Sequence, residues 1–505
     1  MRNRLTGAGS QSETLSSSRA NRIVPRLAAF FLAAVILIYL SFIGIANWMA
    51  DEYDDFGKLA HQGWHAVWLR LQWSPRPVSE PLFLLYGWTV NHFRHPLIVP
   101  FLAVLWCAFF AAGLVTYWQR GRAGNRGISR AETGVPELLI PLSLMASFVS
   151  GGAISEAFYW PAGAAECVPT VAASLLFFLQ VARGRLATAG GRRLCGACLL
   201  VAACSSEMGA AFVLVYAGIQ LLGRAPEMMK RGSSQSPRPA GWWLAPALVA
   251  VLVMASLLVL RLRVTERPVE QARAGNLVAA GIWHLSQEAL GVGLRGDGRL
   301  FVNSRLLSEA LLALGVALCW SLPGDASKQA ASDTAAAAAA FLLASVVTIA
   351  AAEFHFHAVC CQQHETVRRC WILMGLTGIA IAAFGLRWAG RMHRGSLPAL
   401  ASLLLCAGVV VAWHTRPVLR EYRIYGDIHY ALDQNFHSGF DPGSDPMTFL
   451  LLPPGGIIYQ QQVPPGLYTA GEEGPRYVQY VLRFFDKKRM IVRPADEWMP
   501  ERRQR

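Results

Sequence analysis

The segment from Trp242 to Leu260 reads WWLAPALVAVLVMASLLVL, nineteen residues that include no charged side chain. An apolar run of about 18 residues or more is long enough to cross the hydrocarbon core of a bilayer as a helix. A helix is expected because backbone polar groups in lipid must be satisfied within the segment itself. The runs Leu27–Trp48 and Pro96–Trp118 have the same character. Together these segments predict a membrane protein.

The composition of the 505 residues supports this prediction. Hydrophobic residues make up 54% and charged residues only 15%, whereas a soluble domain contains about 25% charged residues. The net charge of +14 comes mostly from short basic loops between the apolar runs. Such loops orient a membrane protein, so nucleic acid is not expected as a partner.

An all-α polytopic membrane protein with about eleven transmembrane helices is therefore the expected fold class. The apolar runs place these helices at Leu27–Trp48, Pro96–Trp118, Val135–Val149, Gly163–Val181, Leu194–Cys204, Met208–Leu222, Trp242–Leu260, Leu306–Leu322, Ala335–Ala352, Trp371–Leu386 and Leu397–Trp413. They form one transmembrane domain over residues 23–413. The polar residues 1–22 are expected to be a disordered cytoplasmic tail rather than a cleavable signal peptide.

Residues 414–505 contain no spanning run and predict a small extracytoplasmic α+β domain. Its expected elements are β-like runs at Phe449–Leu452 and Gly456–Gln460 and a helix at Tyr477–Phe485. Arg19, Arg22 and Arg26 precede the first helix, which predicts a cytoplasmic N-terminus. Eleven crossings then place the C-terminal domain on the outer face of the membrane, which is the periplasm where the membrane is a bacterial inner membrane.

The segment Val78–His92 is apolar but short. If it crossed the bilayer, the basic loop that follows Trp118 would be external, against the rule that basic loops stay inside. We therefore expect a juxtamembrane or re-entrant helix. This loop contains Arg120, Arg122, Arg126 and Arg130.

Two features remain open from the residues alone. The long loop from Arg261 to Arg305 is basic although it is expected outside. Its arginines suit either a solvated surface or phosphate binding. Cys195 and Cys198 form a CxxC within an apolar helix, which favours core packing over a metal or redox site. Residues Cys360, Cys361 and Cys370 lie in a loop, and the sequence does not choose a pairing among them.

Four carboxylates follow the first helix within five residues, at Asp51, Glu52, Asp54 and Asp55. Clustered like charges raise one another's pKa, and a cation or a basic partner relieves the repulsion. A solvated helix start, with Asp at the N-cap, explains the same residues.

Arg76 lies between Pro75 and Pro77. This position suits either a fixed guanidinium that binds phosphate or an anchor at the membrane interface. Tyr159 and Trp160 follow the third helix and offer flat faces that suit either sugar stacking or an aromatic belt. Glu207 lies near membrane depth, where ionisable residues are functional candidates.

A last cluster precedes the tenth helix. His355 and His357 are two residues apart. On a strand both side chains could bind one metal ion, but on a helix they would point in different directions. Arg368 and Arg369 suit either a lipid diphosphate or side chains that extend to the interface.

These pieces, in this order, resemble the GT-C superfamily of membrane glycosyltransferases, and more specifically the bacterial GtrII-like glucosyl transferases and related uncharacterised polytopic families. The resemblance covers about the first 210 residues and beyond them only the architecture. The residues that carry it are Asp54-Asp55-Phe56, Trp73-Ser74-Pro75-Arg76-Pro77, Phe158-Tyr159-Trp160-Pro161-Ala162-Gly163-Ala164 and Ser206-Glu207. The chain departs from its relatives at Pro75, where they have glycine.

The resemblance implies transfer of a sugar from a polyprenyl-phosphate-linked donor on the outer membrane face. Asp54 or Asp55 would act as base or bind a divalent cation. Further possible ligands of that cation are Asp51, Glu52, His355 and His357. Arg76, with Arg368 and Arg369, would neutralise the lipid phosphate. The sugar or acceptor would contact Tyr159, Trp160 and Glu207.

The expected function is therefore a glycosyltransferase that modifies a cell-envelope glycan or lipid. A glycan or lipid transporter or flippase is the second class, but the sequence shows no inverted repeat and few charges within its helices. A non-catalytic envelope assembly protein is the third class. The carboxylate cluster favours the enzyme, because a scaffold does not need it.

Overall fold

A computed structural model describes residues 8–123, 134–150, 154–229, 241–264, 292–294, 300–302, 327–356, 362–388, 409, 416–452 and 462–503. Within these residues the protein is mostly helical, with two small sheets. Six helical segments of the described residues are long and apolar enough to span a bilayer: Arg26–Ile45, Ile98–Val115, Pro161–Ala182, Gly241–Leu260, Lys328–Ala352 and Gln363–Ala383. The chain is thus a helical protein with several candidate membrane spans, while the count of eleven stays a prediction.

The candidate spans belong to six long helices. They are α1 (Ala8–Ser41, continued by the 3-10 turn η1, Phe42–Ile45), α5 (Ile98–Ala123), α7 (Pro161–Ala182), α10 (Gly241–Val264), α13 (Ser327–Phe356) and α14 (Gln362–Trp388). Helix α1 begins at Ala8, so part of the tail that we expected to be disordered is helical. Three further helices lie at other expected spans: α6 (Gly134–Val149), α8 (Ala189–Ser205) and α9 (Glu207–Met229). The expected spans Leu306–Leu322 and Leu397–Trp413 lie outside the described residues, Val409 apart.

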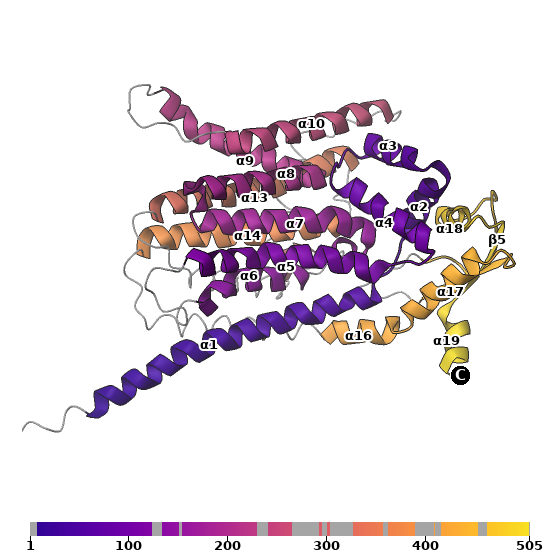
Figure 1. The fold of residues 1–505 in the computed structure, drawn as a ribbon, viewed down its shortest axis with the longest axis horizontal. Coiled ribbons are helices and arrows are strands. Elements are labelled where there is room, and N and C mark those ends of the chain that lie inside the picture. Colours follow the sequence, from indigo (N-terminus) through magenta and orange to yellow (C-terminus); the bar gives the residue numbers. More distant parts are fainter. Residues whose placement is uncertain are drawn as a thin grey trace, which may run out of the picture.

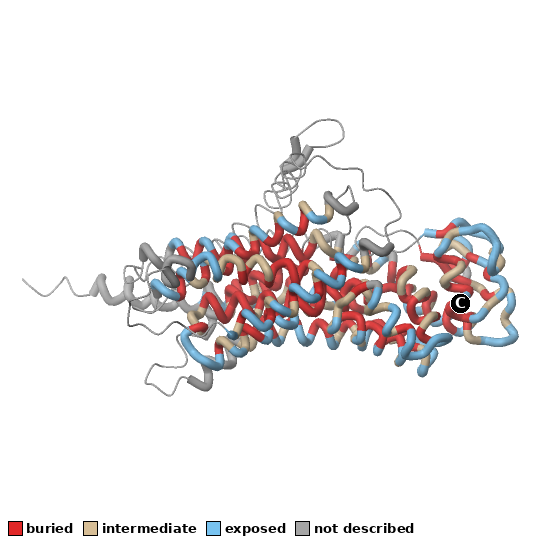
Figure 2. The backbone as a smooth tube through the Cα atoms, turned by 90° about the horizontal axis from the view of Figure 1, so that it is seen from above, coloured by how far each residue is buried: buried red, intermediate tan, exposed pale blue. Residues whose placement is uncertain are grey.

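The long helices run side by side as a bundle (Figure 1) with a buried interior (Figure 2). In the most apolar stretch of Pro161–Ala182, and in that of Gln363–Ala383, 83% of the residues are buried. In that of Gly241–Leu260 only 28% are buried. Helix α7 is rich in Ala, Gly, Ser and Thr, and such small side chains let helices approach closely inside a membrane. Helices α7 and α14 therefore form the centre of the bundle, while α10 lies at its periphery.

Helices α2 (Ala50–Gln62), α3 (Trp64–Trp73) and α4 (Ser79–Phe93) gather at one end of the bundle (Figure 1). Helix α4 matches the short helix expected at Val78–His92. Its 15 residues are fewer than the roughly 20 that cross a bilayer. The chain then turns sharply before α5, because Arg94 and Leu97 both adopt left-handed backbone conformations, with φ of 51° and 44°.

The C-terminal residues form a small α+β unit at the same end of the bundle (Figure 1). Strand β5 (Arg489–Arg493) lies centrally, parallel to β3 (Met447–Leu450) and antiparallel to β4 (Gly466–Thr469). The helices are α16 (Arg416–Tyr425), α17 (Ile428–Phe440), α18 (Arg476–Phe485) and α19 (Ala495–Arg503). The expected helix at Tyr477–Phe485 is confirmed as α18, and β3 overlaps the β-like run Phe449–Leu452. The run Gly456–Gln460 lies outside the described residues.

Helix α18 packs directly on α2. Its buried face includes Tyr477 and Phe484, whose rings meet Tyr53 of α2 at centroid distances of 5.6 Å. Phe484 also passes so close to Gly57 that a Cβ atom on Gly57 would lie 3.3 Å from the Phe484 Cα. The C-terminal domain and the carboxylate-rich helix therefore share one core at the same end of the bundle.

The expected outer loop contains a two-stranded antiparallel sheet, β1 (Val292–Leu294) and β2 (Leu300–Val302). Its arginines lie outside the described residues, except Arg261 and Arg263 in the last turn of α10. The phosphate role considered for this loop stays a prediction.

Candidate functional site

A cavity of about 650 Å³ opens where α2, α3 and α4 meet the end of the bundle. Its size is typical of pockets for small molecules. One part of its wall carries charged and polar side chains, namely Asp51, Arg70, Arg76, Glu80, Glu166, Glu207, Gln363 and His364. The other part is apolar and comes from α9, α10 and α13, with Met208, Ala211, Met254, Leu257, Leu258, Val347 and Ala351. The cavity is therefore amphipathic.

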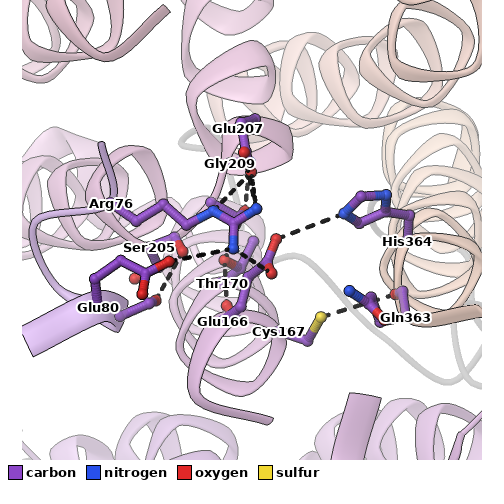
Figure 3. Close-up of polar contacts among 12 residues, drawn as sticks. Arg76, Glu80, Glu166, Cys167, Thr170, Ser205, Glu207, Gly209, Gln363 and His364 are labelled. Atoms are coloured by element: carbon purple, nitrogen blue, oxygen red, sulfur yellow. Dashed lines mark hydrogen bonds and ion pairs between the residues drawn. The ribbon is translucent and has the colours of Figure 1, made fainter. Parts of the chain in front are cut away.

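Arg76 lies at the centre of the charged part (Figure 3). Its Nε and NH2 groups donate to the two carboxylate oxygens of Glu207, at 2.9 and 2.8 Å. Its NH1 group donates to Glu166 at 2.7 Å and lies 3.6 Å from Glu80. Burial lowers the pKa of Arg76, but the Glu166 and Glu207 carboxylates outweigh burial and raise it above its usual value. Arg76 therefore holds three helices together through charge.

The backbone around Arg76 is fixed by the turn between α8 and α9. The Val78 amide donates to the Cys204 carbonyl at 3.0 Å, and the Ser79 hydroxyl donates to the Ser205 carbonyl at 2.7 Å. Ser206 caps α9, because its hydroxyl accepts from the Gly209 amide at 2.9 Å. This places Glu207 in the first turn of α9, opposite the guanidinium.

Arg70 forms a second ion-pair centre beside the first. Its Nε donates to Glu80 at 2.7 Å and its NH1 donates to Asp55 at 2.6 Å. Burial lowers the pKa of Arg70, but the Asp55 and Glu80 carboxylates outweigh it and raise the pKa. Arg70 also lines the cavity, and its NH2 group donates to none of the described residues.

The four clustered carboxylates of α2 have four different surroundings. Asp54 pairs with Lys58, at 2.5 Å, and with Arg483 of α18, at 3.1 Å, away from the cavity. Asp55 pairs with Arg70, and its burial raises its pKa to about 6. Neither residue lines the cavity.

Glu52 is fully buried and joins two helix starts. It accepts from the amides of Met49 and Ala162, at 2.9 and 3.0 Å, and from the Trp160 indole at 2.9 Å. A carboxylate is well suited to N–H groups that have no partner within their helix. Burial nevertheless raises the pKa of Glu52 to about 8. Glu52 thus ties α2 to α7 and holds Trp160 against the cavity.

Asp51 differs from its three neighbours. It lines the cavity, and it makes no hydrogen bond or ion pair with the described part of the chain. Burial raises its pKa, and nearby Arg70 partly opposes that shift. Asp51 is therefore a half-buried carboxylate that faces the cavity and is available to a ligand.

A close backbone approach shapes the wall beside Asp51. A Cβ atom on Gly163 would lie 2.0 Å from the Glu156 carbonyl of the π-helical turn η2 (Ser155–Tyr159) and 2.7 Å from the Trp160 ring. Only glycine fits there, and it lets α7 begin against this turn.

Of the residues singled out from sequence, the cavity brings together Asp51, Arg76, Trp160 and Glu207. Tyr159 lies in the core instead, where its hydroxyl donates to the Tyr39 carbonyl at 2.8 Å. Arg368 and Arg369 are buried in α14 and do not line the cavity. The site roles proposed for these three residues stay predictions.

A metal centre finds no support among the described residues, which contain no group of three or more His, Cys, Asp or Glu side chains placed to hold an ion. His355 lies in the last turn of α13, and His357 lies outside the described residues. Cys195 and Cys198 are free and buried, as expected for core residues.

Sequence reasoning missed Arg70, Glu80 and Glu166. Glu166 had a readable signal, because it is a carboxylate inside the expected span Gly163–Val181 and such residues are functional candidates. Arg70 and Glu80 had no comparable signal, since their pairing depends on how α3 and α4 fold together.

Comparisons of the chain with protein-family models, with curated proteins and with solved structures found no match. Function is therefore inferred from the cavity and the residues that line it.

Proposed function

We propose that this protein is a membrane glycosyltransferase that transfers a sugar from a polyprenyl-phosphate-linked donor to a glycan or lipid acceptor of the cell envelope. The reaction would take place on the outer face of a bacterial inner membrane. The observation that carries the proposal is Asp51, a carboxylate without a partner among the described residues, which faces an amphipathic cavity at the end of a helical bundle.

The two parts of the cavity wall suit the two parts of such a donor. The apolar part includes Leu258 of α10, which is 62% exposed, so this wall reaches the outer surface of the bundle. An isoprenoid chain would lie against it. The sugar and phosphate would lie among the charged residues, where water-excluded electrostatic interactions are strong.

Asp51 would serve as the general base. The acceptor hydroxyl would attack the anomeric carbon, and its proton would pass to Asp51 as the new glycosidic bond forms. The bond between the anomeric carbon and the phosphate oxygen would break at the same time, leaving the negative charge on the polyprenyl phosphate. The unused N–H groups of Arg70, supported by Arg76, would stabilise that charge. In the sequence the base was expected at Asp54 or Asp55, which the structure places in ion pairs outside the cavity.

The experiment is a lipid analysis of inner membranes from cells that lack the protein. We expect a polyprenyl-phosphate sugar to accumulate, as measured by mass spectrometry of extracted lipids. The wild-type chain should clear it, and Asp51→Asn should not, although it is present at the wild-type level. An unchanged lipid profile in the deletion would refute the proposal.

A lipid or glycan flippase is the second candidate, since Glu166 and His364 place ionisable groups within candidate spans. The same cells separate the two functions. A flippase predicts that the lipid-linked sugar accumulates on the cytoplasmic face, whereas a transferase predicts accumulation on the outer face. The face is read from whether an impermeant periodate reagent oxidises the sugar in intact spheroplasts.

A further inference from the structure

Helix α3 exposes its largest apolar side chains and buries a small one. Trp64 and Trp68, one helical turn apart, are 68% and 60% exposed. Ala66, on the inward face of the same helix, is only 5% exposed. A helix at the surface of a soluble protein shows the opposite pattern, because burial of the larger apolar side chain gains more free energy. The outward face of α3 is therefore suited to contact with an apolar phase.

The inward face of α3 is held to the protein chiefly by charge. Arg70 pairs with Asp55 at 2.6 Å and with Glu80 at 2.7 Å. Ala66 belongs to a small buried cluster with Leu59 and Leu84, separate from the main core. These contacts fix α3 in place while the described residues leave its tryptophan face largely uncovered.

Helix α4 packs beside α3 and repeats the pattern. Its side chains Leu85, Trp88 and Phe93 are all at least half exposed. Both helices lie at the same end of the bundle (Figure 1). Exposed large apolar side chains are ordinarily scattered singly over a soluble surface, so their concentration on two short neighbouring helices indicates a contact surface.

The position of α3 identifies what this surface contacts. Arg70 of α3 lines the same cavity as Leu258, which lies two residues before the end of the candidate span Gly241–Leu260. Ala352 and Gln363, the last and the first residues of two other candidate spans, line this cavity as well. Helix α3 therefore lies beside the ends of three spans, at the level where hydrocarbon gives way to lipid headgroups.

From these observations we infer that α3 docks on the headgroup region of the lipid bilayer, with Trp64 and Trp68 inserted among the lipids. Tryptophan favours this depth, because its ring is apolar and its indole N–H is polar. The other exposed residues described on α3 are His65, Leu69 and Gln72. None of these five is a carboxylate, a lysine or an arginine, so docking removes no permanent charge from water.

Docking of α3 does not depend on the proposed function, because contact with lipid requires no substrate. It does have a consequence for the cavity. Arg70 belongs to the cavity wall and to α3, so the bilayer surface would help to keep this guanidinium in place.

Photo-cross-linking of the full chain in nanodiscs of phosphatidylethanolamine and phosphatidylglycerol tests the contact. The photoreactive residue p-benzoylphenylalanine replaces Trp64 or Trp68, and mass spectrometry of the irradiated protein measures lipid adducts. Leu467 on strand β4 of the C-terminal domain is the matched control, because it is 60% exposed but belongs to no candidate span. The adduct yield at Trp64 and Trp68 should exceed that at Leu467 at least ~10-fold, as expected for an apolar helix face in the interface.

Hydrogen exchange in the same nanodiscs provides a second measurement with ordinary side chains. The double variant Trp64→Ser, Trp68→Ser should exchange the α3 amides at least ~10-fold faster than the wild type, because weaker docking lets the helix open more often. Trp64→Phe, Trp68→Phe keeps the apolar rings and should exchange nearly as slowly as the wild type. Leu467→Ser should leave exchange in α3 unchanged.

Three results would overturn the inference. The first is an adduct yield at Trp64 and Trp68 no higher than at Leu467. The second is cross-linking of these positions to protein instead of lipid, which would identify a protein partner or another part of the chain as the occupant. The third is unchanged α3 exchange in the double serine variant. Loss of sugar transfer without any of these results would concern the proposed function alone.

Discussion

At the scale of single residues, Asp51, Glu52, Asp54 and Asp55 show how one short acidic run can carry four roles. Successive residues on a helix point about 100° apart, so each carboxylate of α2 meets a different neighbour. Asp54 reaches α18, Asp55 reaches Arg70, Glu52 reaches α7 and Asp51 reaches the cavity. These surroundings, together with those of Arg76, lead to three predictions.

Asp51→Asn should lower the rate of sugar transfer by on the order of 10²-fold or more, as expected when a general base is lost. Asp54→Asn, the matched control, should stay within about 3-fold of the wild type, because a surface ion pair is worth little. The rate is measured with a radiolabelled lipid-linked sugar in nanodiscs. The pKa of Asp51 is raised, and a base must be ionised. The acid limb of the wild-type rate profile should therefore lie above the ordinary range of an aspartate. If Asp54→Asn lowered the transfer rate more than Asp51→Asn, the general base would be Asp54.

Arg76→Ala should destabilise the protein by about 3–5 kcal/mol, because it leaves the buried Glu166 and the partly buried Glu207 without their counter-charge. Arg483→Ala, the control on the exposed Asp54 pair, should cost about 0–1 kcal/mol. The thermal midpoint of the detergent-solubilised protein measures both. Adding Glu207→Gln to Arg76→Ala should recover part of the loss. Equal midpoints for Arg76→Ala and the wild type would show that the buried network contributes no stability.

The raised pKa of Glu52 predicts how the stability of the folded protein depends on pH. Its folded pKa is raised from 4.5 to about 8, so the folded state binds the proton more tightly than the unfolded state. The resulting stabilisation is complete below about pH 4.5 and is lost as pH rises toward 8. Asp55, with a pKa of about 6, contributes the same trend at lower pH.

The measurement is the thermal midpoint at pH 7 and at pH 8, both above the pKa of about 6 at which Asp55 titrates. The wild-type midpoint should fall between these values, and Glu52→Gln should flatten the fall because glutamine does not titrate. A wild-type midpoint that rises over this interval would contradict the raised pKa.

At the scale of secondary-structure elements, the contact between α2 and α18 joins the C-terminal domain to the site. Trp48, just before α2, packs its ring against Tyr53, Phe56, Phe436 and Phe484, at centroid distances of 5.0 to 5.7 Å. Aromatic pairs at such distances add to the gain from burial. The domain therefore fixes the orientation of α2, and with it the direction of Asp51.

Gly57→Val tests this coupling. The nearest atoms to a Cβ at Gly57 belong to the Phe484 backbone, the first at 3.3 Å, so α18 must move away to admit the side chain. We expect faster release of the C-terminal domain by trypsin and a transfer rate lowered at least ~10-fold by the misplaced base. Gly190→Val is the matched control, because a Cβ at Gly190 meets no atom within 4 Å. If Gly57→Val kept normal protease resistance and activity, the contact between α2 and α18 would not position Asp51.

At the scale of the whole molecule, the shared core of α2 and α18 constrains the topology. If the candidate spans cross a bilayer, both segments must lie on one side of it, and the chain must cross an even number of times between them. The eleven predicted helices satisfy this condition, since ten of them fall between α2 and the C-terminal domain. The condition fixes only the parity of the crossings, and their number stays a prediction.

Fusions of a reporter that is active only outside the inner membrane test the topology. We expect activity for a fusion after Arg505 and none for a fusion after Arg130, because basic loops stay inside. Cysteines at Gln72 and at His95, on either side of α4, should both react with an impermeant thiol reagent from outside. An active fusion after Arg130, or labelling at Gln72 alone, would mean that α4 crosses the bilayer.

Apolar runs and basic loops determined, from the sequence alone, a helical chain with candidate membrane spans, a short helix near residues 79–93 and a helix at 477–485. These are local properties, because the length and period of an apolar run depend only on neighbouring residues. Arg76, Trp160 and Glu207 were also singled out from the sequence, by the residues next to them. The tertiary structure alone showed that Glu80 and Glu166 join Arg76, and that Asp51 faces the cavity while Asp54 faces α18. These contacts join residues as much as 429 positions apart in the chain. Ion pairing and burial depend on where the helices cross, which no local pattern records.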